Sequence, residues 1–313
     1  MTAIATGMKA SQRTIPRKRI AAAFAGNNGS IAAYANFPFV IVKSVLPSHI
    51  GTHSHEYFEI DIVLSGSGHV VNGGKRYELG VNDIMLGNQF DTHAIVSRRR
   101  ISLLSIKFGP ALFGTEHAAP LLAAFVAPGV DFRRRVPLDA DEKRSIRTIA
   151  ELLLGEYTAK RKQWQQTVTP LFEAILSILR RGFETHLAER NITVDTGHFP
   201  LVYRIMTYLD EHYCEELRMR DIVKRFGGSS SYAASLFTRI IGHSLKRYVI
   251  VKRVLAAKRL LTNTDDPISD ICFAVGFGHR VTALNQGQHG PATDRIRTRN
   301  SAAPSAAPWP ARR

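Results

Sequence analysis

The chain has 313 residues, 44% of them apolar, which is sufficient for two ordinary domains with hydrophobic cores and argues against a disordered polymer. Its net charge of +16 favours a polyanionic partner. No stretch approaches the roughly 20 consecutive apolar residues of a membrane span, and the apolar run near the N-terminus is too short for a signal peptide. Cys214 and Cys272 have no partners at metal-ligand spacing, so we expect free thiols in a reducing cytoplasm.

The first half of the chain changes from an irregular segment to a β-rich one. Residues 1–30 are basic and rich in small residues without periodicity, which predicts a flexible arm. Between Phe39 and Phe108, short runs of strand-forming residues are separated by Gly, Asn and Asp turn signals. Many short strands at this spacing predict a sandwich or barrel, which we place at residues 31–110.

The segment THSHEYFEIDIVLSGSG has polar side chains at every second position. Strand geometry would place one polar set on one face: His53, His55, Tyr57, Glu59 and Asp61. It would place an apolar set on the other: Phe58, Ile60, Ile62 and Leu64. His-x-His, then Glu four residues later and Gly seven beyond that, resembles the first cupin motif, and a looser second motif ends at His93.

The cupin resemblance leaves three interpretations of the polar face open. In metal-binding cupins the residues matching His53, His55, Glu59 and His93 hold Fe, Mn or Zn, and imidazole and carboxylate sets suit such metals. The same side chains could instead line a pocket for a small organic ligand, because converging polar groups suit hydroxyl-rich molecules. The histidines could also be purely structural.

Two amphipathic helices are expected next, over roughly 141–161 and 168–188. In the second, large apolar side chains lie close to one stripe: Leu171, Ile175, Ile178, Leu179, Phe183 and Leu187. Such a stripe packs against a second copy of the chain or against the chain's own core. We expect residues 111–190 to form a helical dimerisation segment in a homodimer, followed by a linker at 191–198.

The next stretch is strongly basic. Between Leu217 and Asn263 the chain has eleven Lys or Arg residues and one acid, Asp221. A solvated face is the ordinary alternative for a charge run, but such faces usually mix signs. A helical stretch of one sign favours nucleic acid as the partner.

LRMRDIVKRFGGSSSYAASLFTRIIGHSL predicts two short helices joined by a turn. Gly227 permits the turn, and Ser229 is placed to cap the second helix. Apolar residues give both helices a buried face: Leu217, Met219, Ile222, Val223 and Phe226, then Tyr232, Leu236, Phe237, Ile240 and Ile241. This is the pattern of a helix-turn-helix, whose second helix lies in the major groove. A long basic helix follows, and Pro267 with ISDICFAVGFG begins a second unit.

Residues 199–278 resemble the C-terminal domain of the AraC/XylS family of bacterial transcription regulators, in which one long helix joins two helix-turn-helix units. The resemblance rests on FTRIIGHSLKRYVIVKRVLAAKRLL and PISDICFAVGFG at the right separation. It implies an α+β multidomain chain, with an N-terminal cupin-like β-barrel and two dimerisation helices, then a C-terminal all-α tandem helix-turn-helix domain.

The resemblance also implies double-stranded DNA as a partner. The residues expected at this interface are Arg220, Ser229, Ser231, Ala234, Ser235, Thr238, Arg239, Lys246 and Arg247. Small side chains stand where longer Arg or Gln readers are common, and Gly228 stands where an apolar anchor is usual. Weak base readout is therefore expected, because Ser and Ala cannot make bidentate contacts to bases.

In this family the cupin-like domain commonly keeps the histidines without a metal and binds an effector, often a sugar. NGGKRYELGVND resembles the rhamnose-type members most. We therefore expect an effector pocket lined by His53, His55, Tyr57, Glu59 and His93, with no metal, no cofactor and no catalytic residue.

The family pattern stops after Gly278. Residues 279–313 contain six Arg, four Pro and seven Ala without a helical stripe, which predicts disorder. Our hypothesis is that a reading-frame shift near codon 279 replaced the native end of the gene product; a natural divergent tail is the alternative. Either way the second helix-turn-helix would be incomplete and specific DNA binding impaired.

The sequence thus predicts an effector-responsive transcription regulator, with RNA polymerase as a further partner. The alternative is a metal-dependent cupin enzyme, an oxygenase or isomerase, with an appended helical domain. A third possibility is a regulator inactivated by its altered C-terminus that still dimerises and senses its effector.

Overall fold

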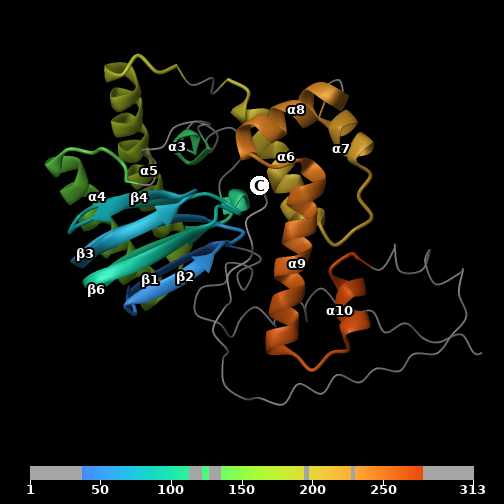
Figure 1. Cartoon of the computed structure of the whole chain (residues 1–313), viewed down its shortest axis with the longest axis horizontal. Helices are drawn as coiled ribbons and strands as arrows, with labels where there is room; N and C mark the ends of the chain where they lie inside the picture. The colour runs from blue at the N-terminus through green and yellow to red at the C-terminus, as the bar shows by residue number, and fades with distance from the viewer. Residues whose placement is uncertain (1–36, 113–121, 127–134, 194–196, 227–229, 278–313) are drawn as a thin grey trace, which may run out of the picture. The chain divides into compact units, whose positions relative to one another are not determined.

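The computed structural model describes residues 37–112, 122–126, 135–193, 197–226 and 230–277. The arm expected at 1–30 and the tail at 279–313 lie outside the described residues. Strands come first along the chain and helices follow (Figure 1). This order agrees with a sheet-rich N-terminal domain and a helical C-terminal domain.

Six strands form one antiparallel sheet. They are β1 (Phe39–Val45), β2 (His49–His53), β3 (Phe58–Asn72), β4 (Lys75–Leu79), β5 (Ile84–Gly87) and β6 (His93–Phe108). The strand order is β1-β6-β3-β4, with β2 paired to β6 and β5 paired to β3. The two long strands β3 and β6 therefore form the centre of the sheet, and they carry most of the polar site described below.

Glycines shape the sheet at two points. The β3–β6 register shifts between Val63 and Gly68, where Gly66 has a φ of 86° and an added Cβ would lie 2.3 Å from the Arg100 carbonyl oxygen. Gly73 and Gly74 both have positive φ and form the two-residue turn between β3 and β4, as hairpins of this twist require. An irregularity of this kind bends the strands, and β3 and β6 therefore contribute side chains to both apolar clusters described next.

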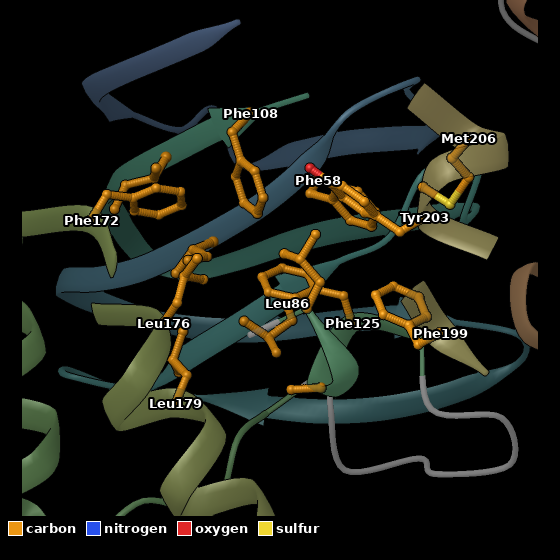
Figure 2. Packing of buried hydrophobic residues seen from close by; sticks show 14 of the residues in the cluster. Phe58, Leu86, Phe108, Phe125, Phe172, Leu176, Leu179, Phe199, Tyr203 and Met206 are labelled. Carbon is orange, nitrogen blue, oxygen red and sulfur yellow. The ribbon is translucent and has the colours of Figure 1, made fainter. Parts of the chain in front are cut away.

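The sheet buries apolar side chains on both faces. Phe58, Ile60 and Ile62 belong to a core that also contains Phe108, Phe125 and Phe172. Figure 2 shows the four phenylalanines of this core. A second cluster lies on the other face: Val63, Val70, Leu79, Met85, Ile95, Ile101 and Leu103. Phe108 packs edge-on against Phe125 and Phe172 at centroid distances of 5.5 and 4.8 Å, a geometry that adds to their area burial.

Two short elements and two long helices follow the sheet. They are the 3-10 helix η2 (Pro110–Leu112), α3 (Ala123–Val126), α4 (Ala140–Ala159) and α5 (Trp164–Glu189). Helix α4 begins with a capping box, in which Asp139 accepts from the Glu142 amide and Glu142 reaches back to the Asp139 amide. Both long helices were expected at these places, with α5 starting four residues earlier than the pattern indicated.

The apolar stripe of α5 is largely used within the chain. Ile175, Leu179 and Phe183 are buried in the same core, where Figure 2 shows Leu179, whereas Leu171 and Ile178 are only partly buried. Of the two alternatives for this stripe, an intrachain core face therefore accounts for most of it. The homodimer remains a prediction.

The remaining helices are α6 (Phe199–His212), α7 (Met219–Arg225), α8 (Ser230–Ile241), α9 (Leu245–Asn263) and α10 (Ile268–Ala274). Phe199, Tyr203 and Met206 of α6 belong to the same core as Phe58 and Phe125 (Figure 2). Helix α10 packs on α9 through Ile271 and Val275, which join Ala256 and Leu260 in a small cluster. No helix among the described residues has the length and apolar character needed to span a membrane.

Candidate functional site

The polar segment from His53 to Asp61 is split between two strands. Strand β2 ends at His53 and β3 begins at Phe58, so the expectation of one continuous strand was wrong. The break has a local cause: the Phe90 amide donates to the His55 carbonyl at 2.7 Å, and the His55 ring turns back to the Tyr57 carbonyl. From Phe58 onward the expected alternation holds, with Glu59 and Asp61 on the face opposite Ile60.

All five predicted pocket residues nevertheless lie close together. The His53 and His93 ring centroids are 4.3 Å apart, those of His55 and His93 are 5.3 Å apart, and the His55 ring stacks on Tyr57 at 4.0 Å. His55 Nε2 lies 3.0 Å from a Glu59 carboxylate oxygen. The pairing of His53 with His93 across β2 and β6 brings the second motif to the first.

The rings of the three histidines are oriented by the same kind of backbone contact. Each Nδ1 lies within hydrogen-bond distance of a backbone carbonyl two residues away: Gly51 for His53 at 3.0 Å, Tyr57 for His55 at 2.9 Å, and Asp91 for His93 at 3.3 Å. Such a contact makes Nδ1 the donor and leaves Nε2 as the acceptor for a ligand or a metal in a neutral ring, or as a second donor to a carboxylate in a protonated one.

Sequence reasoning missed two residues of this site. Lys107 Nζ lies 3.7 Å from Glu59 and 5.3 Å from the centre of the Tyr57 ring, and Ser105 donates to Asp61. Both stand on β6, opposite Glu59 and Asp61 in the β3–β6 register. No sequence signal gives that register, because several shifts interrupt the pairing of the two strands.

Glu59 and Asp61 have opposite ionisation behaviour. Burial opposes ionisation of Glu59, but the hydrogen bond from His55 and the charges of His55, Lys107 and His93 outweigh it and lower the pKa to about 2. Burial and repulsion from Glu59 raise the pKa of Asp61 to about 7, against the hydrogen bond from Ser105. At neutral pH the site therefore contains one firmly ionised carboxylate and one that readily takes a proton.

Two members of the site, His93 and Tyr57, are held neutral. Burial, followed by the charges of His53 and His55, lowers the pKa of His93 to about 4. Burial, followed by the charges of Glu59 and Asp61, raises the pKa of the Tyr57 hydroxyl far above its ordinary value. Neutral imidazole and phenol groups can both donate and accept hydrogen bonds, which suits hydroxyl groups on a ligand.

The enclosed space beside these residues is small. A cavity of about 20 Å³ is lined by Glu59, Asp61, Val70, Met85, Leu86, Gly87, His93 and Ile95. It has room for about one water molecule, whereas pockets for organic ligands typically measure about 300 Å³ or more. A sugar would have to open the site, because of the five predicted pocket residues only Glu59 and His93 line this cavity.

The same residues can also accommodate a metal ion. The ligand atoms of His55, Glu59 and His93 all lie within 4.8 Å of one another, and the three residues are buried. Two imidazoles and an ionised carboxylate suit a divalent transition metal.

A second candidate site is the basic helical region. Helix α8 buries Ala233, Leu236, Phe237, Ile240 and Ile241. Tyr232 was expected in this set, but it is 48% exposed and its hydroxyl lies 3.2 Å from a His198 ring nitrogen. Ala233 replaces it because one helical turn before Phe237 falls on Ala233.

Most of the residues predicted to contact DNA lie at the surface. Four of them on α8 are exposed: Ser231, Ser235, Thr238 and Arg239. Ala234 is partly buried, Arg220 is exposed on α7, and Lys246 and Arg247 are exposed in the first turn of α9. Ser229 lies outside the described residues.

The basic residues of α9 are not one solvated stripe, and here the structure corrects the sequence pattern. Lys252 is buried with its Nζ 2.7 Å from Asp210, and Arg253 donates to the carbonyls of Tyr213 and Glu215 at 2.7 Å. Arg259 forms an ion pair with Glu56. Three of these six positive charges thus hold the chain's own fold together. Lys246, Arg247 and Lys258 are exposed.

At the beginning of the second helix-turn-helix unit, Gly276 occupies a position that requires glycine. Gly276 has a φ of 95°, and an added Cβ would lie 2.8 Å from the Cys214 carbonyl oxygen and 2.9 Å from the Arg253 side chain. Ile271 and Val275 are covered by α9, whereas Ile268 is 65% exposed. Within the described residues, α9 therefore covers only part of the apolar surface of this helix.

Comparison with known proteins finds matches to both halves of the chain. The profile of the AraC-like ligand binding domain matches residues 46–190, and that of a helix-turn-helix domain matches residues 222–283. The transcriptional activator RhaS of Klebsiella pneumoniae is 23% identical over 248 residues, covering 78% of this chain and 86% of its own length. The transcriptional regulator YbfI of Bacillus subtilis is 24% identical over 232 residues, covering 72% and 78%.

Among solved structures, ToxT of Vibrio cholerae resembles the chain with a TM-score of 0.47 and 13% identity, over 80% of this chain and 90% of ToxT. The two domain matches define the class: a DNA-binding transcription regulator with a ligand-binding domain. The chain belongs to the AraC/XylS family of these regulators.

Proposed function

We propose that this regulator senses a small hydroxyl-bearing metabolite, a sugar or a related compound, in the polar site of its N-terminal domain. The effector would contact His53, His55, Tyr57, Glu59 and His93, with Lys107 added to the set. The observation that carries the proposal is the buried, ionised Glu59 carboxylate, which lies 3.0 Å from His55 Nε2 and 3.7 Å from Lys107 Nζ, with the neutral His93 and Tyr57 beside it. Enclosed charged and neutral hydrogen-bonding groups in this mixture favour a polyhydroxylated molecule over an apolar one.

The proposal assigns one role to each domain that was predicted from the sequence. Residues 31–110 would bind the effector, 111–190 would provide helices for a homodimer, and 199–278 would bind DNA, with RNA polymerase as a further partner. Arg220, Arg239, Lys246 and Arg247 would contact phosphates, while the small side chains of α8 would read bases weakly. Specific binding would be impaired by the altered segment after Gly278.

A thermal-shift screen with sugars and sugar acids tests the effector proposal. A ligand that binds only the folded state raises the melting temperature by mass action, and Glu59→Gln should abolish that rise. Glu78→Gln is the matched control, because Glu78 is an exposed carboxylate paired with Arg76 and Arg98 away from the site. A rise that persists in E59Q would place the ligand elsewhere.

A divalent metal is the second candidate occupant, favoured by the small cavity and by the clustered ligand atoms of His55, Glu59 and His93. A bound transition metal would supply a Lewis acid at this position. Metal analysis of the purified protein separates the candidates: stoichiometric iron, manganese or zinc that disappears in E59Q supports the metal. Substoichiometric metal together with a sugar-dependent thermal shift supports the effector pocket.

A further inference from the structure

Helix α9 is held at two points by the loops that form the sensing site. The first is the ion pair between Arg259 and Glu56, whose side chains are only 19% and 10% exposed. Glu56 lies between His55 and Tyr57, so its backbone belongs to the turn that positions both. Burial lowers the pKa of Arg259 to about 10, which still leaves the guanidinium charged at neutral pH.

The second point lies three helical turns earlier on α9. The Tyr248 hydroxyl lies 2.8 Å from the Gln89 side-chain oxygen and 2.8 Å from Asp210, and the Phe90 ring packs edge-on against Tyr248 at 4.9 Å. Tyr248 and Gln89 are both buried. This contact therefore joins Gln89 and Phe90, in the segment between β5 and β6, to Tyr248 of α9 through groups that water does not reach.

The two contacts are joined to each other and to the sensing site. The Gln89 side-chain amide donates to the Glu56 carbonyl at 2.8 Å, and the Phe90 amide donates to the His55 carbonyl at 2.7 Å. Phe90 itself has a φ of 63°, a conformation that a bulky residue adopts only when its surroundings enforce it. A ligand that displaces the His55–Tyr57 turn would therefore act on residues that contact α9.

We propose that Glu56, Gln89 and Phe90 form an autoinhibitory contact that restrains α9 and withholds Arg259 from DNA until an effector displaces the His55–Tyr57 turn. The inference rests on the proposed DNA binding of the helical half. An effector shifts this equilibrium only as far as it binds the released form more tightly, and opening of the 20 Å³ cavity supplies such a difference.

The substitution Glu56→Gln tests the restraint, because it keeps the shape of the side chain and removes its charge. Its control is Glu78→Gln, which removes an equally negative charge from an exposed pair. DNA affinity is measured by fluorescence anisotropy on a duplex of arbitrary sequence over a range of salt concentrations, without effector. We expect E56Q to bind severalfold more tightly than E78Q and to show a salt slope steeper by about 0.9, the value for one added phosphate contact.

A double variant tests whether Arg259 is the positive charge that becomes available to DNA. Adding Arg259→Gln to E56Q should return both the affinity and the slope to the wild-type values. Equal affinities and slopes for E56Q and E78Q would overturn the restraint and leave the proposed DNA binding intact. Absence of DNA binding by wild type, E56Q and E78Q alike would refute the proposed function, and this inference with it.

Hydrogen exchange of the DNA-free protein provides a readout of the contact that does not require DNA binding. Amides of α9 should exchange faster than in E78Q, those around Arg259 in E56Q and those in the first turns in Tyr248→Phe, while β3 and β6 keep their protection and show that the variants fold. Unchanged exchange in α9 in both variants would overturn the inference.

Discussion

Among single residues, the clearest feature is the pair of carboxylates on β3. Glu59 and Asp61 are two positions apart, both buried, and face the same side of the sheet. His55 and Lys107 are close to Glu59, whereas Asp61 has the hydroxyl of Ser105 and the repulsion of Glu59. Environment rather than residue type therefore separates a permanent anion from a carboxyl group that titrates near neutrality.

Replacing Asp61 by asparagine tests this separation. Because the folded-state pKa of Asp61 is about 7 and its ordinary value is 3.8, the folded protein keeps the proton through a range in which the unfolded chain has lost it. The contribution of Asp61 to the free energy of unfolding thus falls as the pH rises from about 4 to 7. An asparagine side chain stays neutral at all these pH values, so D61N should gain stability relative to wild type as the pH rises.

Urea unfolding at pH 5 and pH 8, with a chelator present, measures the effect. The stability difference between D61N and wild type should be more favourable to the variant at pH 8. Glu78→Gln controls for the simple loss of a negative charge. A difference of equal size at both pH values would show that Asp61 does not titrate in this range.

At the scale of elements, α4 has an exposed apolar position that tests the predicted homodimer. Leu152 is 58% exposed on the side of α4 away from its buried residues Ile146 and Leu153. Leu152→Glu should convert a dimer to a monomer, measured by light scattering after size exclusion, because a buried unpaired carboxylate at an interface is strongly unfavourable. Val81→Glu is the control, since Val81 is 53% exposed in a turn between β4 and β5. A dimer that survives L152E excludes this face of α4.

The elements also show how far the sequence could predict the structure. Alternation from Phe58 to Ile62 and the helical periods of α4, α5 and α8 were readable, because each depends on residues near one another in the chain. The pairing of Glu59 with Lys107 and of Asp61 with Ser105 was not, because it depends on the register of two strands about 45 residues apart. The roles of Lys252, Arg253 and Arg259 were missed for a related reason: their partners are distant in sequence, and a basic run looks solvated until the partners are known.

For the whole molecule, the frameshift hypothesis predicts that the present chain has lost part of the DNA recognition of its ancestor. Tandem readers of this family place their recognition helices in successive turns of the major groove, about 34 Å apart. The pattern for the second recognition helix is missing after Gly278. We therefore expect one of the other reading frames of the gene to encode a helix with an aromatic pair and following basic residues. If neither frame does, the frameshift hypothesis is wrong and the tail is a natural divergence.

Selection from a pool of random duplexes tests the consequence for DNA recognition. The present chain should enrich at most a short, weak motif, because α8 supplies small side chains to one stretch of groove. A version with the second recognition helix restored from the other frame should enrich two elements about one helical turn apart. Enrichment of the two-element motif by the unrestored chain would show that the second unit works as it stands.

The central claim is that exposed positive charges of α8 and α9 bind duplex DNA, and its most direct test is the salt dependence of binding after two of them are removed. Arg239→Gln with Arg247→Gln is compared with Arg180→Gln with Arg181→Gln, which removes two exposed charges from α5. The account predicts that the first pair weakens binding and lowers the salt slope by about 1.8, at about 0.9 per phosphate contact, while the second pair leaves the slope unchanged. Equal slopes for the two double variants, or no DNA binding by the wild-type chain at low salt, would contradict it.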